Sequence, residues 1–242
     1  MLLRLVVLLF ISPSALPVSA EEIRIATASN FALPLRDLAN RFEERSDHKV
    51  TLALGSTGKH YAQIRLGAPF HLFFAADAER PERLEQEGFT LPNTRFSYAW
   101  GKLILWSPQP DVVDSQGNVL ETMDFRHLAI ANPRLAPYGR AAEEILRARG
   151  SWEDLQKRLV RGENISQAFH FVHGEHAELG FVALSQVQER AGSRWIPPDD
   201  LYAPIEQQAV QLRAHPGAEA FLTFIRGEEA KACIQSYGYG TQ

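Results

Sequence analysis

A cluster of small, hydroxyl and basic residues at positions 55–60, Gly-Ser-Thr-Gly-Lys-His, has the composition of an anion-binding loop. A glycine-containing loop that leads into a helix offers backbone N–H groups to an oxyanion. A nucleotide-binding P-loop needs another glycine five places before Gly58 and a Ser or Thr after the lysine, but His60 follows Lys59. The loop therefore predicts a site for a small anion that is not a nucleotide.

Hydroxyl and amide side chains recur at four places where an apolar run gives way to an amphipathic stretch. These places hold Ser29 and Asn30, Ser56 and Thr57, Tyr138, and Asn164 and Ile165. Each helix start carries unpaired N–H groups and about half a positive charge. Several starts that converge could therefore bind a dianion without any Lys or Arg. The alternative is that Ser29, Ser56 and Asn164 only cap their own helices.

The elements that must position these residues alternate along the chain. Apolar, strand-like runs are followed by helical patterns at 31–46, 59–67, 78–88, 139–150 and 164–172. In the first of these, Leu35, Leu38, Ala39 and Phe42 recur at helical spacing, which predicts one apolar face. Strand alternating with helix predicts mostly parallel sheets covered on both faces, and ligands then bind beyond the carboxyl ends of the strands. The pattern restarts after the long apolar run at 98–108, so two α/β units are predicted. An extended segment at 203–213 and two helices complete the chain.

Net charge, the first twenty residues and the cysteine count limit what kind of protein this is. A formal net charge of -4 argues against a nucleic-acid binder. Residues 1–20 have an early cation, an apolar run and a small-x-small ending, which predicts a secretory signal peptide cut after Ala20. The single cysteine, Cys233, cannot form an intramolecular disulfide, and we expect it to be a buried small residue.

Several longer motifs resemble one family of proteins. They include Ala-Thr-Ala-Ser-Asn at 26–30, the stretch from Gly55 to Leu84, Ala-Pro-Tyr-Gly at 136–139 and Leu-Gly-Phe-Val-Ala-Leu at 179–184. With these motifs the chain resembles the periplasmic molybdate- or tungstate-binding proteins of ABC transporters. The resemblance implies a type II periplasmic binding protein fold of two α/β lobes joined by crossing strands. Lobe 1 would comprise residues 21–100 with 204–242, and lobe 2 residues 101–203.

The resemblance also implies a site, residue by residue. The ligand-binding positions of the family fall on Ser29, Asn30, Ser56, Thr57, Tyr138 and Ile165. Thr57 stands where the family carries a second serine, and Ile165 where it often carries valine. The implied job is capture of molybdate or tungstate in the periplasm and delivery to a membrane permease, by a protein with no cofactor and no catalytic activity.

The chemistry of such a ligand explains why charged residues are not needed. A tetrahedral dianion has no proton to donate, so a pocket of donors suits it and rejects protonated phosphate, whose O–H would lack an acceptor. Sulfate would have to be excluded by cavity size. Asp77 could supply an acceptor, but its place just before a helix predicts that it caps that helix.

Three other functions compete with this interpretation. Ser56-Thr57-Gly58-Lys59 is an S-x-x-K motif, as in exported acyl-transfer enzymes, although no S-D-N or K-T-G accompanies it. His170, His173 and His176 could ligate zinc or nickel, or form a solvated polar turn. The same fold could also bind sulfate, thiosulfate or a small carboxylate, because fold alone does not determine the ligand. With no disulfide and no evident apolar stripe, we expect a monomer.

Overall fold

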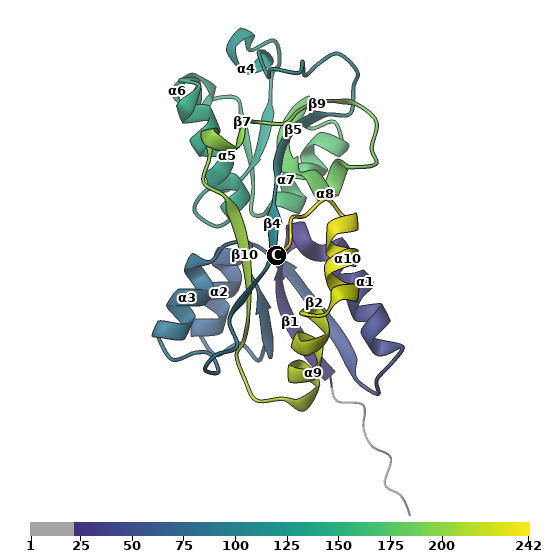
Figure 1. Cartoon of the computed structure of the whole chain (residues 1–242). Helices are drawn as coiled ribbons and strands as arrows, with labels where there is room; N and C mark the ends of the chain where they lie inside the picture. Colours follow the sequence, from purple (N-terminus) through teal and green to yellow (C-terminus); the bar gives the residue numbers. More distant parts are fainter. Residues whose placement is uncertain (1–21) are drawn as a thin grey trace, which may run out of the picture.

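The molecule consists of two lobes, each built on a five-stranded sheet (Figure 1). The structure is a computed structural model and describes residues 22–242. The predicted signal peptide and its cleavage site after Ala20 lie outside the described residues.

The sheet of lobe 1 has the strand order β2-β1-β3-β10-β4. Its strands are β1 (Glu22–Ala28), β2 (Lys49–Gly55), β3 (Leu72–Phe74), β4 (Phe96–Gly101) and β10 (Ile205–Gln211). Its helices are η1 (Ser29–Phe31), α1 (Ala32–Glu43), α2 (Thr57–Arg65), α3 (Glu79–Gln86), α9 (Pro216–Ile225) and α10 (Glu228–Ser236).

The sheet of lobe 2 has the order β7-β6-β8-β5-β9. Its strands are β5 (Leu103–Ser107), β6 (Leu128–Ala131), β7 (Leu159–Gly162), β8 (Leu179–Ala183) and β9 (Ser193–Trp195). Its helices are α4 (Val119–Thr122), α5 (Pro137–Ala148), α6 (Trp152–Leu155), α7 (Ile165–His173), α8 (Leu184–Val187) and η2 (Asp199–Leu201).

Both sheets are mostly parallel, as the alternating pattern predicted. In lobe 1, β1 pairs in parallel with β2 and β3, while β10 is antiparallel to both of its neighbours. In lobe 2, β6 pairs in parallel with β7 and β8, and β5 is the reversed strand. Each sheet therefore has one reversed strand in the second-to-edge position. The predicted α/β fold of two lobes is confirmed.

The chain passes between the lobes along β4 and β10 (Figure 1). The apolar run at 98–108 is divided between β4 in lobe 1 and β5 in lobe 2, with the change of sheet at Lys102. At the other crossing, Ile205 at the start of β10 pairs with Gly101 at the end of β4. The two crossing strands thus run side by side where the lobes meet.

Separate apolar cores hold the helices against each sheet. On α1, the predicted stripe of Leu35, Leu38, Ala39 and Phe42 is buried. The spacing of three and four residues puts these side chains on one helical face. In lobe 2, Ile145 and Leu146 of α5 are fully buried in its core. No helix between residues 22 and 242 combines the length and apolar character needed to cross a membrane.

Candidate functional site

Four helix starts, two from each lobe, meet at one cleft between the lobes. We call it the inter-lobe cleft; the space in it that a water-sized sphere can occupy is about 10 Å³. It is lined by Ala28, Ser29, Asn30, Gly55, Ser56, Thr57, Ala76, Ala136, Pro137, Tyr138, Asn164 and Ile165. All six residues predicted for the site, Ser29, Asn30, Ser56, Thr57, Tyr138 and Ile165, are therefore brought together. Their contact with a ligand remains a prediction.

The strand ends explain why these segments converge. β1 and β2 are parallel neighbours, and Ala28 and Gly55 at their carboxyl ends are directly paired. Helices η1 and α2 follow immediately, so both start at the same edge of the sheet. In lobe 2, Ala131 and Gly162 are paired in the same way at the ends of β6 and β7, ahead of α5 and α7.

Positive electrostatic potential in the cleft comes from the backbone. Among residues 22–242, none of the side chains lining the cleft carries a formal charge. The helix starts of α2, α5 and α7 each bring a partial positive charge to it, although several of their first N–H groups already have partners within the protein. An anion in this cleft would be stabilised without any cation beside it.

Two of the predicted caps are indeed caps. The Ser56 Oγ accepts from the backbone N–H of Lys59 at 3.4 Å, and the Asn164 Oδ1 accepts from that of Gln167 at 3.0 Å. Both residues also line the cleft, so capping and lining are not exclusive alternatives. Helix α5 has Ala136 at its N-cap and Pro137 at its first position, and no side chain covers its first turn.

Ser29 is not a cap of its own helix but a link between the lobes. Its Oγ donates to Asn164 Oδ1 at 3.0 Å and accepts from the Ser166 N–H at 3.3 Å. The Ser166 Oγ in turn donates to the Ser29 carbonyl oxygen at 3.1 Å. These bonds hold the start of η1 against the start of α7 and set the width of the cleft at this end.

The hydroxyls of Thr57 and Tyr138 are oriented by bonds that they accept. The Thr57 Oγ1 accepts from the Ala76 N–H at 3.0 Å, which leaves its own proton for another partner. The Tyr138 hydroxyl accepts from Gln207 Nε2 at 3.2 Å. Burial raises the pKa of Tyr138 well above its ordinary value, so it stays a neutral donor at physiological pH.

The lobes also touch on both sides of the cleft. The Gly58 N–H of lobe 1 donates to the Leu135 carbonyl oxygen of lobe 2 at 2.8 Å. Lys59 pairs with Glu163 at 3.0 Å, and Arg140 pairs with Glu79 at 2.9 Å. The two lobes are thus in direct contact beside the residues that line the cleft.

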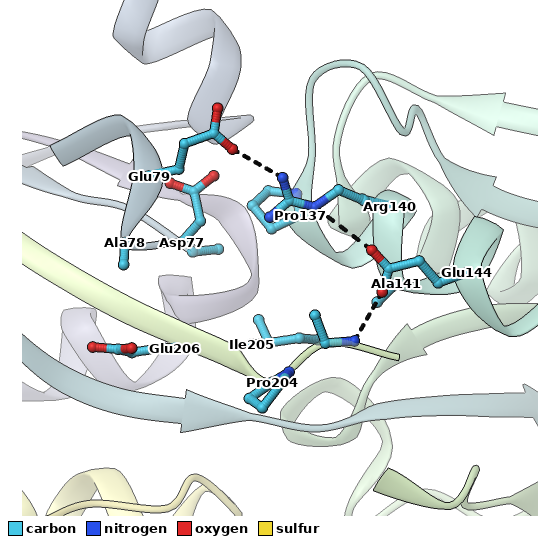
Figure 2. A pocket seen from close by; sticks show the side chains of 12 residues that line it. Asp77, Ala78, Glu79, Pro137, Arg140, Ala141, Glu144, Pro204, Ile205 and Glu206 are labelled. Carbon is cyan, nitrogen blue, oxygen red and sulfur yellow. Dashed lines mark hydrogen bonds and ion pairs between the residues drawn. The ribbon is translucent and has the colours of Figure 1, made fainter. Parts of the chain in front are cut away.

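A larger cavity adjoins the inter-lobe cleft and differs from it in charge (Figure 2). The space in it that a water-sized sphere can occupy is about 160 Å³, and it shares Ala76 and Pro137 with the cleft. Four carboxylates line it, those of Asp77, Glu79, Glu144 and Glu206, against the single guanidinium of Arg140. Because like charges repel, the larger cavity is the poorer place for an anion.

Asp77 lies in this second cavity and bonds the first turn of α3, although the N-cap position itself is held by Ala78 and not, as predicted, by Asp77. Its Oδ1 accepts from the Arg80 N–H in the first turn of α3 at 3.1 Å, and its other oxygen pairs with the Arg80 guanidinium. The carboxylate is thus absent from the lining of the inter-lobe cleft.

The two rival sites in the sequence do not form the arrangements that their chemistry needs. The Lys59 Nζ binds Glu163, and what bonds Ser56 Oγ is the backbone N–H of Lys59, so the lysine is not placed as a base for this serine. The His173 ring stacks on Phe169, with centroids 5.4 Å apart. Within the part of the chain that the structure describes, no three His, Cys, Asp or Glu side chains are grouped to hold a metal ion.

Sequence reasoning missed the residues behind the cleft. Tyr98, Ser185, Gln207 and Tyr239 form a hydrogen-bonded layer under Asn30 and Tyr138. The sequence signal was weak, because Gln207 is the middle one of three consecutive polar residues in the extended segment Ile-Glu-Gln-Gln-Ala-Val. A buried glutamine in a strand needs partners for both ends of its amide.

Known proteins resemble this chain over almost its full length. The family model of the bacterial extracellular solute-binding proteins matches residues 23–240. The molybdate-binding protein ModA of Azotobacter vinelandii is 48% identical over 246 residues, which cover 99% of this chain and 98% of the relative. ModA of Rhodobacter capsulatus is 46% identical, with 94% of this chain and 92% of the relative covered.

A solved structure shares the fold as well. The periplasmic molybdate-binding protein of Azotobacter vinelandii superimposes with a TM-score of 0.88 at 42% identity, covering 91% of this chain and 99% of that one. The relatives of the present chain are thus substrate-binding transport proteins, and the family resemblance noted in the sequence is confirmed. The chain belongs to the family of bacterial extracellular solute-binding proteins.

Proposed function

We propose that this protein binds molybdate or tungstate in the inter-lobe cleft and delivers it to the permease of an ABC transporter. One observation carries the proposal: helix starts and hydroxyl groups from both lobes converge on a cleft whose lining has no charged side chain. The names of the relatives point to the same ligand.

The donors available in the cleft suit a fully deprotonated tetrahedral dianion. From lobe 1 the ligand would accept hydrogen bonds from the backbone of Ser29 and Asn30 and from the Ser56 and Thr57 region. From lobe 2 it would accept from the Tyr138 hydroxyl and the Ile165 N–H. Without a carboxylate in the lining, a protonated anion would leave its own O–H without an acceptor, which lowers its affinity.

Ligand contacts from both lobes would couple binding to closure. A ligand that touches one lobe alone stabilises open and closed forms equally, whereas one that touches both favours the closed form. The permease would then distinguish loaded from empty protein by the relative position of the lobes. The proposed protein is a periplasmic monomer that is exported by a signal peptide cut after Ala20. It uses no cofactor and catalyses no reaction.

The proposal is tested by thermal unfolding of the mature protein with molybdate, tungstate, sulfate or phosphate at matched ionic strength. At a thousandfold excess over its dissociation constant a ligand adds about 4 kcal/mol of stability. For a chain of this length the midpoint should rise by about 8 to 16 °C. We expect this shift with molybdate and tungstate, and none with phosphate. If sulfate alone raised the unfolding midpoint, the fold would stand, but the proposal that the ligand is molybdate or tungstate would be refuted.

A further inference from the structure

A buried polar network lies directly behind the inter-lobe cleft, and Gln207 is at its centre. Gln207 lies on the crossing strand β10 and is fully buried. Its side chain contacts Asn30 of lobe 1 and Tyr138 of lobe 2, which both line the cleft. One amide thus joins the two halves of the site.

The hydrogen bonds of Gln207 fix which end of its amide faces each lobe. Its Oε1 accepts from Asn30 Nδ2 at 2.8 Å and from the Tyr98 hydroxyl at 3.1 Å. Its Nε2 donates to the Tyr138 hydroxyl at 3.2 Å. With Asn30 as placed, the reverse orientation would bring two NH₂ groups together, which is unfavourable because neither accepts. The donor end of Gln207 therefore faces Tyr138.

This orientation determines what Tyr138 can offer to the cleft. A phenol has one proton, and its oxygen accepts hydrogen bonds. Because the Tyr138 oxygen accepts from Gln207, its proton is not used in that bond, and it can be donated either to the neighbouring Tyr239 hydroxyl or to a ligand. If Gln207 presented an acceptor instead, the Tyr138 hydroxyl would donate its proton to Gln207. Only the lone pairs of the Tyr138 oxygen would then be available to a ligand.

The same network withdraws the Asn30 side chain from ligand binding. The Asn30 Nδ2 has two protons, and its two partners are Gln207 Oε1 at 2.8 Å and the Tyr239 hydroxyl at 3.1 Å. The Tyr239 hydroxyl then donates to the Asn30 carbonyl oxygen at 2.8 Å. The contribution of Asn30 to an anion is therefore its backbone N–H, held in place by its own side chain.

Gly101 leaves the space that this arrangement needs. It ends β4, the other crossing strand, and lies against the contact between Tyr138 and Gln207. A Cβ at this position would overlap the Tyr138 hydroxyl oxygen and press on Gln207 Nε2. The close approach of the two side chains is thus built into both crossing strands.

We propose that Gln207 is a positioning and specificity-determining residue, which makes Tyr138 a hydrogen-bond donor toward the bound anion. Gln207 does not itself touch the ligand. The inference rests on the proposed function, because it requires an anion in the inter-lobe cleft. It explains how Tyr138 can present a donor to the ligand, which favours deprotonated dianions.

The test replaces Gln207 by glutamate and measures molybdate affinity by calorimetry between about pH 5.5 and 8.5, a range in which a buried glutamate can titrate. An ionised Glu at 207 accepts at both oxygens, so it takes the Tyr138 proton. We expect the dissociation constant at the alkaline end to rise about 10- to 150-fold, as for loss of a hydrogen bond to a charged group. A protonated Glu has a donor and an acceptor like Gln, so the affinity should recover as the pH falls.

Gln208→Glu is the matched control, since it makes the same change at the next residue. The Gln208 side chain accepts from Arg95 Nη1 at 2.8 Å and lies outside the network. We expect its affinity to match that of the wild-type protein at every pH. Equal, pH-independent binding by Gln207→Glu and Gln208→Glu would overturn the inference. Failure of the wild-type protein to bind molybdate would refute the proposed function instead.

A double-mutant cycle covers the case in which Gln207→Glu does not fold. Gln207→Leu is uncharged and removes the donor that orients Tyr138. If Gln207 acts through the Tyr138 hydroxyl, this change weakens molybdate binding in the wild-type background and has no further effect in a Tyr138→Phe background. Additive losses in the double variant would show that Gln207 does not act through Tyr138.

Discussion

Tyr138 lines the cleft and combines a buried ring with a hydroxyl group that meets the network behind the cleft. Its ring belongs to the core of lobe 2, and its hydroxyl meets the crossing strand through Gln207. Since burial keeps the phenol neutral, its strength as a donor does not depend on pH in the physiological range. In the proposed function, a neutral donor at this point would bind an anion without a counter-charge and leave size and protonation state to decide among anions.

We expect Tyr138→Phe to raise the dissociation constant for molybdate about 10- to 150-fold, the range for losing a hydrogen bond to a charged group. The control is Tyr61→Phe, because the Tyr61 hydroxyl binds Glu87 at 2.8 Å on the exposed surface of α2. Calorimetric titration of both variants provides the measurement. An unchanged affinity in Tyr138→Phe would remove this residue from the proposed site.

Among the elements, α1 shows how well periodicity predicts a helix and its buried face. Leu35, Leu38 and Phe42 were expected on one face and are buried there. The apolar run at 98–108 shows what periodicity misses, because strands on both sides of Lys102 are equally apolar although they belong to different sheets. Composition cannot reveal such a change of partner.

We expect Leu38→Ala on α1 to lower the free energy of unfolding by about 2 to 5 kcal/mol, since it leaves a cavity in the core of lobe 1. Leu33→Ala on the same helix is the control, because Leu33 is 53% exposed and should change stability by less than about 0.5 kcal/mol. Urea unfolding of the two variants distinguishes these values. Equal losses would contradict the assignment of the buried face.

For the whole molecule, the sequence predicted the two-lobe fold and the convergence of helix starts, because both follow from local pattern and strand order. It did not predict the network behind the cleft. Asn30 and Gln207 are 177 positions apart, and nothing near either residue indicates that they meet. The lobe boundaries at 100–101 and 203–204 stay a proposal. They would place the hinge where β4 and β10 pass from one lobe to the other.

Stability of the whole fold should depend on pH through His60. This ring is buried under the cleft, with Nε2 3.2 Å from the Thr27 carbonyl oxygen, and burial lowers its pKa. Between the ordinary pKa of about 6.5 and the lower native value, the unfolded chain binds a proton that the native protein does not. The free energy of unfolding should therefore decrease as pH falls below about 6.5.

Urea unfolding from about pH 7.5 to 5 measures this slope. His71, whose pKa burial also lowers, adds to it in the same direction. We expect His60→Gln to reduce the slope. If His60→Gln and the wild-type protein had the same slope, the effect would have to come from other groups.

The late position of β10 in the chain has a kinetic consequence. In the sheet of lobe 1, β10 lies between β3 and β4 and pairs with both. A chain synthesised as far as residue 204 therefore has every strand of lobe 2 but lacks β10. Pairing Ala209 with Phe74 closes a very long loop, and such non-local contacts form slowly. Lobe 2 can thus assemble early from a continuous stretch, whereas the lobe 1 sheet and the binding cleft are completed last. A nascent chain would remain unable to bind anion until nearly all of it is available for folding.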